Sequence, residues 1–258
     1  MRESRNILVV LGLLAICGAS RAVGAVNIVG GSNATSANNF THYTVAVEIV
    51  IRVEGVASQN TCTGTIIDSS RVVTAAHCVG NFESGRIVFQ LANVDNTWFG
   101  PTVRAITGLP KVEPGYLGDN SLYNPLQDDN DVSVVTFSGG LPAGFSPANF
   151  LASKDELLQK AVVGSAVMIV GYGTTFDPFN SDTPPDGNTL RFTTGPLTDY
   201  TDGQGNFTVR NEGHSACEGD SGGPAIITLD GVEYVIGVLS RAVCGSSSRY
   251  SAVYSSAL

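Results

Sequence analysis

The chain has 258 residues, of which 43% are hydrophobic and 14% are charged. This composition supports a buried core and excludes a disordered chain. The formal net charge at pH 7 is −9 and the sequence has no basic stripe. We therefore expect no nucleic-acid partner and no association with an anionic membrane.

Residues 1–25 have the features of a secretory signal peptide. Arg2 and Arg5 precede the apolar run ILVVLGLLAICGA, and small residues follow it, with a cleavage position after Ala25. The run contains about 13 residues, whereas a membrane-spanning helix needs roughly 20. We therefore predict a secreted, extracellular protein; the alternative is a retained anchor or a buried helix.

Beyond the leader, the periodicity is that of β-strands. In residues 44–53, TVAVEIVIRV, apolar side chains recur at every second position and share one face: Val45, Val47, Ile49, Ile51 and Val53. A period of two is typical of a half-buried strand. Further β-rich runs lie at residues 63–75, 131–137, 161–173 and 233–240.

Helix signals are few. In residues 153–161, SKDELLQKA, Ser153 is a candidate N-cap with Glu156 three positions later, which predicts one short helix. Many short strands separated by Gly, Pro, Asn and Ser clusters predict a sandwich or barrels. Residues 138–150 are the expected bridge between two halves of the chain.

The cysteine count agrees with export. If Cys17 leaves with the leader, an even number remains: Cys62, Cys78, Cys217 and Cys244. In an oxidising compartment these predict two disulfides, with three possible pairings. Thiolate ligation of a metal is the alternative, which we disfavour because no two of these cysteines form a close ligand pair. We expect no metal and no cofactor.

The stretch GHSACEGDSGGPA, residues 213–225, surrounds Ser221 with very small side chains. A nucleophilic hydroxyl needs a base, an acid that orients the base, and backbone N–H donors for the developing oxyanion. Glycines beside the serine would leave room for an acyl group and free the amides to point at it. The alternative interpretation is a glycine-rich turn with a bystander serine.

Three further motifs accompany this stretch: IVGG at 28–31, VVTAAHC ending in His77 and Cys78, and DDNDVSVVTF containing Asp131. Together they resemble the chymotrypsin-like family of serine peptidases, over nearly all of residues 28–258. The resemblance implies an all-β fold of two six-stranded antiparallel barrels with the active site between them. We expect barrel one at about 28–140 and barrel two at about 141–258, after a signal peptide (1–25) and a short pro-segment (26–27).

The resemblance also implies a catalytic triad. Ser221 is the nucleophile, His77 the base and Asp131 the residue that orients the base, while the amides of Gly219 and Ser221 form the oxyanion hole. Asp131 is preferred over Asp128 and Asp129 because NDVSVV matches the family's Asn-Asp before an apolar strand. The implied activity is that of a secreted serine endopeptidase that forms an acyl-enzyme and needs no cofactor.

Two pairings follow from the same resemblance. The disulfides are expected to join Cys62 to Cys78 and Cys217 to Cys244. Cleavage before IVGG is expected to free the amino group of Ile28, which pairs with Asp220 and orders the oxyanion hole. The residue before Ile28 is Asn27 rather than Arg or Lys, so the zymogen is not expected to need a trypsin-like activating protease.

The primary specificity pocket is expected to be neutral. The family places its floor at Ser215 and its walls at Ser240, Ala242 and Ala252, so cleavage is expected after uncharged residues of small to medium size. Arg241 stands where a tryptophan is usual. His214 and Glu218 could tune the mouth of the pocket, but a solvated role is the simpler interpretation for both.

The expected partners are protein or peptide substrates, an activating protease and protein inhibitors, and the chain is expected to be a monomer. A second function stays open: a catalytically silent or weak relative that acts as a binding protein. Asn27 and Arg241 suggest it, as does the end of the sequence at Leu258, where relatives continue into a C-terminal helix.

Overall fold

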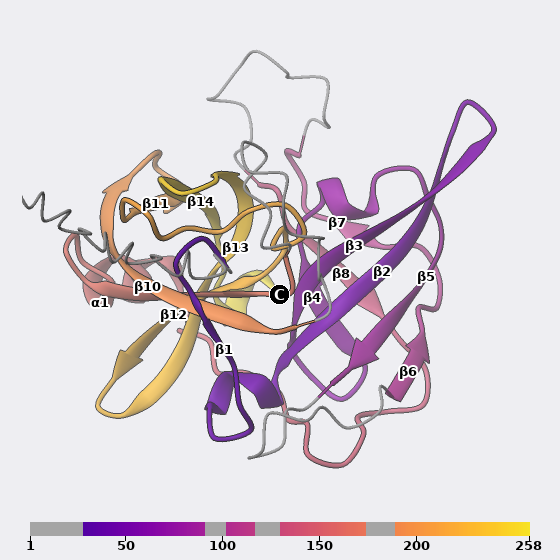
Figure 1. Ribbon diagram of the computed structural model, residues 1–258, viewed down its shortest axis with the longest axis horizontal. Coiled ribbons are helices and arrows are strands. Elements are labelled where there is room, and N and C mark those ends of the chain that lie inside the picture. Colours follow the sequence, from indigo (N-terminus) through magenta and orange to yellow (C-terminus); the bar gives the residue numbers. More distant parts are fainter. Residues whose placement is uncertain (1–27, 91–101, 117–129, 174–188) are drawn as a thin grey trace, which may run out of the picture.

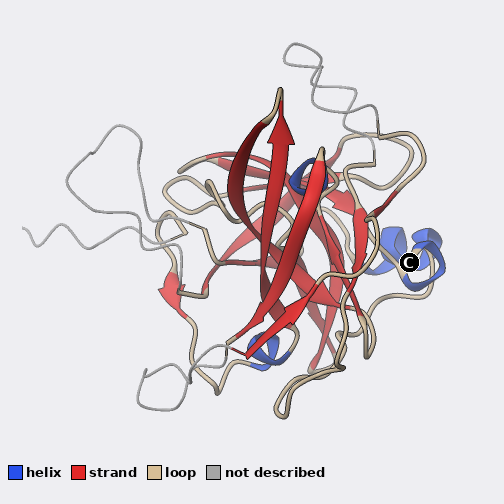
Figure 2. Cartoon of the chain, turned by 90° about the vertical axis from the view of Figure 1, so that its right-hand side faces the viewer, coloured by secondary structure: helices blue, strands red, loops and turns tan. Residues whose placement is uncertain are grey.

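A computed structural model of the chain describes residues 28–90, 102–116, 130–173 and 189–258 (Figure 1). The expected signal peptide and pro-segment, Asp128 and Asp129 lie outside the described residues. Strands dominate the described chain, and the helices are short (Figure 2). Within these ranges no helix is long and apolar enough to cross a membrane.

One antiparallel sheet is built from the first half of the chain, in the order β6-β5-β2-β3-β4-β8-β7. Its strands are β2 (Thr44–Val53), β3 (Val56–Ile66), β4 (Arg71–Thr74), β5 (Phe82–Phe89), β6 (Thr102–Ala105), β7 (Lys111–Val112) and β8 (Ser133–Thr136). The sheet curls upon itself, because Ile106 forms a bridge with Phe137 and the Thr107 amide donates to the Thr136 carbonyl at 2.8 Å.

A second sheet closes completely into a barrel, in the order β1-β10-β11-β14-β13-β12-β9 with β9 also paired to β10. Its strands are β1 (Ser32–Asn33), β9 (Ala166–Gly171), β10 (Arg191–Tyr200), β11 (Phe207–Arg210), β12 (Pro224–Leu229), β13 (Val232–Val243) and β14 (Ser247–Ala252). The expected all-β fold with two barrels is confirmed.

The β2 strand departs from the predicted half-buried pattern at both ends. Val45, Val47 and Ile49 are buried, but Thr44 and Ala46 of the opposite face are buried as well, and Val53 is 49% exposed. The strand continues into a turn at Glu54 and Gly55, whose φ values are 50° and 85°, and this hairpin projects beyond the sheet (Figure 1). The alternating pattern therefore predicts the strand but not where the core ends.

The predicted short helix is confirmed as α1, Lys154–Lys160. The Ser153 hydroxyl oxygen accepts from the Glu156 amide at 3.3 Å, and a Glu156 carboxylate oxygen accepts from the Ala152 amide at 2.8 Å. Side-chain partners thus satisfy backbone N–H groups at the start of the helix. Three 3₁₀ turns are also described: η1 (Asn39–His42), η2 (His77–Val79) and η3 (Ser255–Ala257).

Both ends of the described chain cross to the other sheet. Ser32 and Asn33 in β1 pair with β10 of the second barrel, although they precede the first sheet in sequence. At the other end, Leu258 packs against the core cluster of the first sheet, and the Arg71 guanidinium donates to its carbonyl at 2.9 Å. These crossings hold the two sheets together.

Candidate active site

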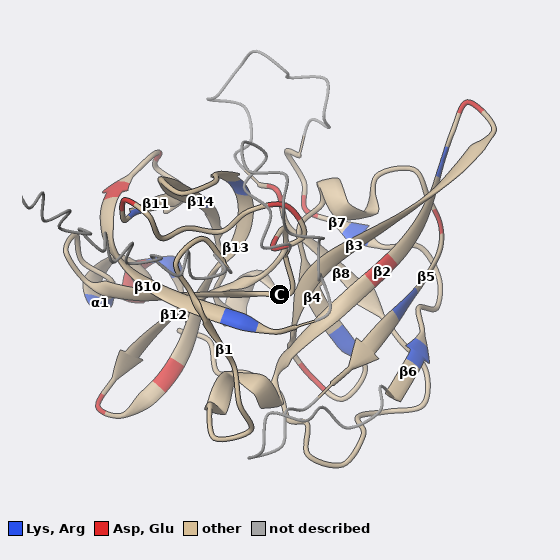
Figure 3. Cartoon of the chain, in the orientation of Figure 1, with Lys and Arg blue, Asp and Glu red and all other residues tan. Residues whose placement is uncertain are grey.

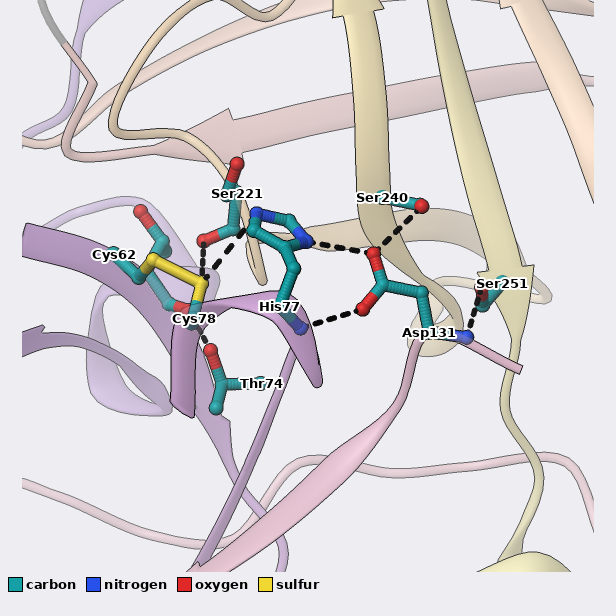
Figure 4. Close-up of polar contacts among 9 residues, drawn as sticks. Cys62, Thr74, His77, Cys78, Asp131, Ser221, Ser240 and Ser251 are labelled. Carbon is teal, nitrogen blue, oxygen red and sulfur yellow. Dashed lines mark hydrogen bonds and ion pairs between the residues drawn. A yellow bond between two sulfur atoms is a disulfide. The ribbon is translucent and has the colours of Figure 1, made fainter. Parts of the chain in front are cut away.

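His77 and Asp131 come together at the ends of two neighbouring strands of the first sheet. His77 opens η2 just after β4, and Asp131 precedes β8, the strand that pairs with β4. His77 Nδ1 lies 2.7 Å from Asp131 Oδ2, and the His77 backbone amide donates to Asp131 Oδ1 at 2.9 Å (Figure 4). The two contacts fix both the position and the ring orientation of the imidazole.

Asp131 is only 3% exposed, and donors from the second barrel complete its surroundings. The Ser240 hydroxyl donates to Oδ2 at 2.7 Å, and the Asp131 amide donates to the Ser251 hydroxyl oxygen at 3.2 Å. Burial opposes ionisation of the carboxyl, but the hydrogen bonds and charge of His77, together with Ser240, outweigh it and lower the pKa of Asp131. Asp131 is therefore ionised at neutral pH.

Ser240 was expected in the wall of the primary pocket. Ser240 is 5% exposed, and its hydroxyl donates a hydrogen bond to Asp131. The structure thus gives Ser240 a role in orienting Asp131, which the sequence interpretation missed.

Ser221 lies between the two sheets, beside His77 (Figure 4). His77 Nε2 and the Ser221 carbonyl oxygen are each 3.8 Å from the sulfur of Cys78. A cavity of about 450 Å³ is lined by both residues and by Gly219, Tyr172 and Glu218, with Gln59, Asn60, Thr61 and the Cys62–Cys78 disulfide on its other side. Ser221 and His77 therefore share one cavity.

Thr63 of β3 clamps the turn that carries Ser221. The Thr63 amide donates to the Ser221 carbonyl at 2.8 Å, and its hydroxyl donates to the Gly219 carbonyl at 3.1 Å. Within the described chain, the amides of Gly219 and Ser221 donate to no other group. Two N–H groups of the same turn thus remain for a ligand, and an oxyanion hole needs such donors.

The glycines that follow Ser221 are needed for internal packing. A Cβ at Gly222, where φ is +82°, would lie 2.1 Å from the Thr74 hydroxyl oxygen, and one at Gly223 would lie 2.3 Å from the Val170 carbonyl oxygen. Both sheets press against this turn, which leaves no space for a side chain at either position.

Asp220 is completely buried beneath the same turn. Its two carboxylate oxygens accept from the Gly173 amide at 2.7 Å and the Cys217 amide at 2.8 Å. Burial raises the pKa of Asp220 to about 7, against the effect of these two hydrogen bonds and of the Arg191 charge. A positive group arriving here would be strongly favoured.

Ile28 is also completely buried, in the core cluster of the second barrel. Val29 forms an antiparallel bridge with Ser215, whose amide donates to the Val29 carbonyl at 3.2 Å. The start of the IVGG stretch therefore packs next to the segment that leads to Asp220 and Ser221.

Two of the expected pocket residues, Ser215 and Ala242, lie close to the end of β13. The Ser215 hydroxyl donates to the Val243 carbonyl at 3.2 Å and accepts from the Gly245 amide at 2.7 Å. The residue opposite Ala242 in the β13–β14 register is Ser248, whereas Ala252 lies opposite Gly237. Ser248 is buried and its hydroxyl oxygen accepts from the Ala216 amide at 3.0 Å. The sequence interpretation did not include Ser248 among the pocket residues.

Two disulfides join Cys62 to Cys78 and Cys217 to Cys244, the pairing that the resemblance implied. The sulfurs of Cys62 and Cys78 and a His77 nitrogen lie within 4.8 Å of one another. Because both sulfurs are in the disulfide, they offer no thiolate to a metal. This cluster therefore does not support a metal site.

His214 is partly buried and contacts barrel two. Its Nδ1 lies 3.3 Å from the Thr193 hydroxyl oxygen, and a Cβ at Gly30 would come within 2.4 Å of the same nitrogen. His214 thus packs against the IVGG stretch, whereas Glu218 is exposed and lines the cavity that Ser221 and His77 share.

Comparison with known proteins identifies the family. The family model named Trypsin matches residues 28–257. The chain belongs to the trypsin family of serine proteases. Trypsin eta of Drosophila erecta is 28% identical over 179 residues, which are 65% of this chain and 64% of that relative. Trypsin Blo t 3 of Blomia tropicalis is 26% identical over 206 residues, 75% of this chain and 71% of the relative.

Larger relatives match over a part of their length. Vitamin K-dependent protein C of Rattus norvegicus is 25% identical over 212 residues, which are 73% of this chain and 42% of that protein. Among solved structures, one described as HL collagenase has a TM-score of 0.63 at 21% identity and covers 87% of this chain and 93% of its own. This likeness shows the trypsin-like fold.

Proposed function

We propose that this chain is a secreted serine endopeptidase that uses Ser221, His77 and Asp131. The observation that carries the proposal is the double contact of His77 with the buried Asp131, at 2.7 and 2.9 Å, beside Ser221 in one cavity. A histidine oriented in this way by a carboxylate is suited to accept a proton at its other nitrogen.

The mechanism follows from these positions. Ser221 Oγ attacks the peptide carbonyl carbon while His77 Nε2 takes the hydroxyl proton, and the negative charge on the carbonyl oxygen is held by the Gly219 and Ser221 amides. His77 then gives the proton to the leaving amine, so the C–N bond breaks and an acyl-enzyme remains. A water molecule, deprotonated by His77, releases the acid and restores Ser221.

Primary specificity is proposed to favour uncharged residues of small to medium size, such as Ala, Val or Leu. Ser215 at the floor supplies no carboxylate to pair with a Lys or Arg side chain, whose desolvation would be uncompensated. Ser248 and Ala242 face each other across two paired strands and narrow the site. We assign the second wall to Ser248 instead of Ala252.

The test is labelling with a serine-reactive organophosphonate, with Ser221→Ala as the matched variant. We expect covalent labelling of the natural chain at Ser221 and hydrolysis of peptides, and neither in Ser221→Ala, which should fold normally because only a hydroxyl is removed. The catalytically silent alternative predicts no labelling of either chain. Peptidase activity that persists in purified Ser221→Ala would remove Ser221 from the nucleophile role.

A further inference from the structure

A second cavity lies on barrel two; it shares no lining residue with the cavity at Ser221, and Ala242 of the expected pocket wall lines it. Its volume is about 370 Å³, and its lining comes from β10, β11, β13 and β14. The lining includes Arg210, Arg241 and Arg249, together with Ala242 and Val243. We call this cavity the arginine cleft.

The charge of the arginine cleft is opposite to that of the protein. The described lining residues carry three guanidinium groups and a single carboxylate, that of Asp199, in a chain whose net charge is −9. Elsewhere both signs are interspersed over the two sheets (Figure 3). A concentrated positive field in an acidic protein is suited to attract an anionic group.

The three arginines of the cleft come from three neighbouring strands. Arg241 and Arg249 are directly opposite each other in the β13–β14 register, and Arg210 is at the end of β11, next to β14. The sheet thus gathers three guanidinium groups around one cavity.

The arginine cleft follows the proposed active site along the sequence of β13. Ser240 contacts Asp131, and the next three residues, 241–243, line the cleft. Because a strand rises about 3.3 Å per residue, an extended substrate covers this distance within roughly two to four residues. The primary pocket takes the residue before the scissile bond, so a cleft beyond its wall meets residues further towards the substrate's N-terminus.

We infer that the arginine cleft binds an acidic side chain of a peptide substrate, about two to four residues N-terminal to the residue that enters the primary pocket. A guanidinium group can hold a carboxylate through two parallel N–H···O hydrogen bonds, a geometry that a neutral side chain cannot match. This inference rests on the proposed endopeptidase function and adds a substrate class to it: acidic peptides.

The test uses paired fluorogenic peptides that are identical except for Glu or Gln at the third and fourth positions before the scissile bond. We expect kcat/KM to be roughly tenfold higher for the Glu peptides at low ionic strength, with the ratio falling as salt is added. In the Arg210→Gln/Arg249→Gln double variant the ratio should approach one. The matched control is Arg86→Gln on β5 of the first sheet, which should keep both the ratio and the activity.

A direct binding measurement separates this inference from the proposed function. The same peptides are titrated into Ser221→Ala, and the Glu peptides should bind with a roughly tenfold lower Kd than the Gln peptides. Equal values for Glu and Gln in both measurements, or a ratio that survives in the double variant, would overturn the inference. Absence of hydrolysis with a retained preference in binding would instead overturn the proposed endopeptidase function and leave the acidic peptide site in place.

Discussion

The buried Asp131 carboxylate shows how single residues from both barrels cooperate. His77 donates to it from the first sheet and Ser240 from the second, and together they keep its pKa low despite burial. A carboxylate with a lowered pKa stabilises the fold above the pKa it has in the unfolded chain, and this stabilisation is lost as the pH falls through the folded-state value.

Replacing Ser240 with Ala should weaken both catalysis and acid stability. The lost hydrogen bond to a charged group amounts to about 1.5 to 3 kcal/mol, so we expect kcat to fall roughly tenfold or more and acid unfolding to move to higher pH. Steady-state kinetics and acid titration followed by circular dichroism measure the two effects. Ser84→Ala, an exposed position on β5, is the control; a Ser240→Ala variant that behaves like it would show that Ser240 does not support Asp131.

We expect the protonation state of His77 to determine how the rate depends on pH. A general base must be unprotonated, so kcat/KM should rise with pH across the range in which a histidine loses its proton, about pH 6 to 7.5. The proposed mechanism uses no metal, so added chelator should leave the rate unchanged. A rate that is flat from about pH 5 to 8, or one that a chelator abolishes and zinc restores, contradicts the proposed mechanism.

At the scale of elements, the end of β9 supports the turn that carries Ser221. Gly171 and Gly173 lie directly against Asp220: a Cβ at Gly173 would be 2.4 Å from the Asp220 Cγ, and one at Gly171 would be 2.1 Å from its Oδ1. Contacts this short require Asp220 to move. Since Gly219 and Ser221 flank Asp220, the two amides proposed for the oxyanion hole would move with it.

Gly173→Ala should therefore abolish most activity. We expect kcat to fall at least about 100-fold, the loss typical when an oxyanion donor is removed, with some loss of thermal stability. Gly203→Ala is the matched control, because a Cβ there meets nothing within 4 Å. Equal kcat values for the two variants would show that the turn tolerates displacement of Asp220.

The elements also show what local sequence can and cannot predict. Ser153 and Glu156 predicted α1 because a capping box acts within one turn of chain. The expected pocket wall at Ala252 depended instead on aligning a short motif near the C-terminus. The β13–β14 register shifts between Leu239 and Arg241 and places Ser248 opposite Ala242. A β-bulge inserts an unpaired residue, which the alignment of a short motif does not take into account.

For the whole molecule, the motifs predicted the all-β fold and identified His77, Asp131 and Ser221 as the candidate triad, because the family's short motifs are specific. They did not predict the contacts made across the two barrels. The contact of Ser240 with Asp131 joins residues that are 109 positions apart in the sequence. The contact of Thr63 with Gly219, in the turn that carries Ser221, joins residues that are 156 positions apart. Such contacts follow from how the sheets pack, which pairwise spacing in the sequence does not specify.

The proposed activation couples the start of the domain to its centre. Asp220 has its pKa raised to about 7 by burial. Between the ordinary carboxyl range, about pH 4, and pH 7, the unfolded chain ionises this group while the folded chain keeps it protonated. Stability from this group is thus complete at low pH and is lost as the pH rises towards 7. A buried ammonium beside Asp220 would reverse this loss.

We therefore expect a chain that begins at Val26 to be inactive and a chain that begins at Ile28 to be active and more stable at pH 7. Removing one partner of a buried ion pair typically costs about 3 to 5 kcal/mol, so Asp220→Asn should abolish the gain in both stability and activity. N-terminal sequencing, thermal unfolding from pH 4 to 7 and peptide hydrolysis of the two forms give the answer. Full activity in a chain that still begins at Val26 would contradict this activation model, because another group would then have to order the oxyanion hole.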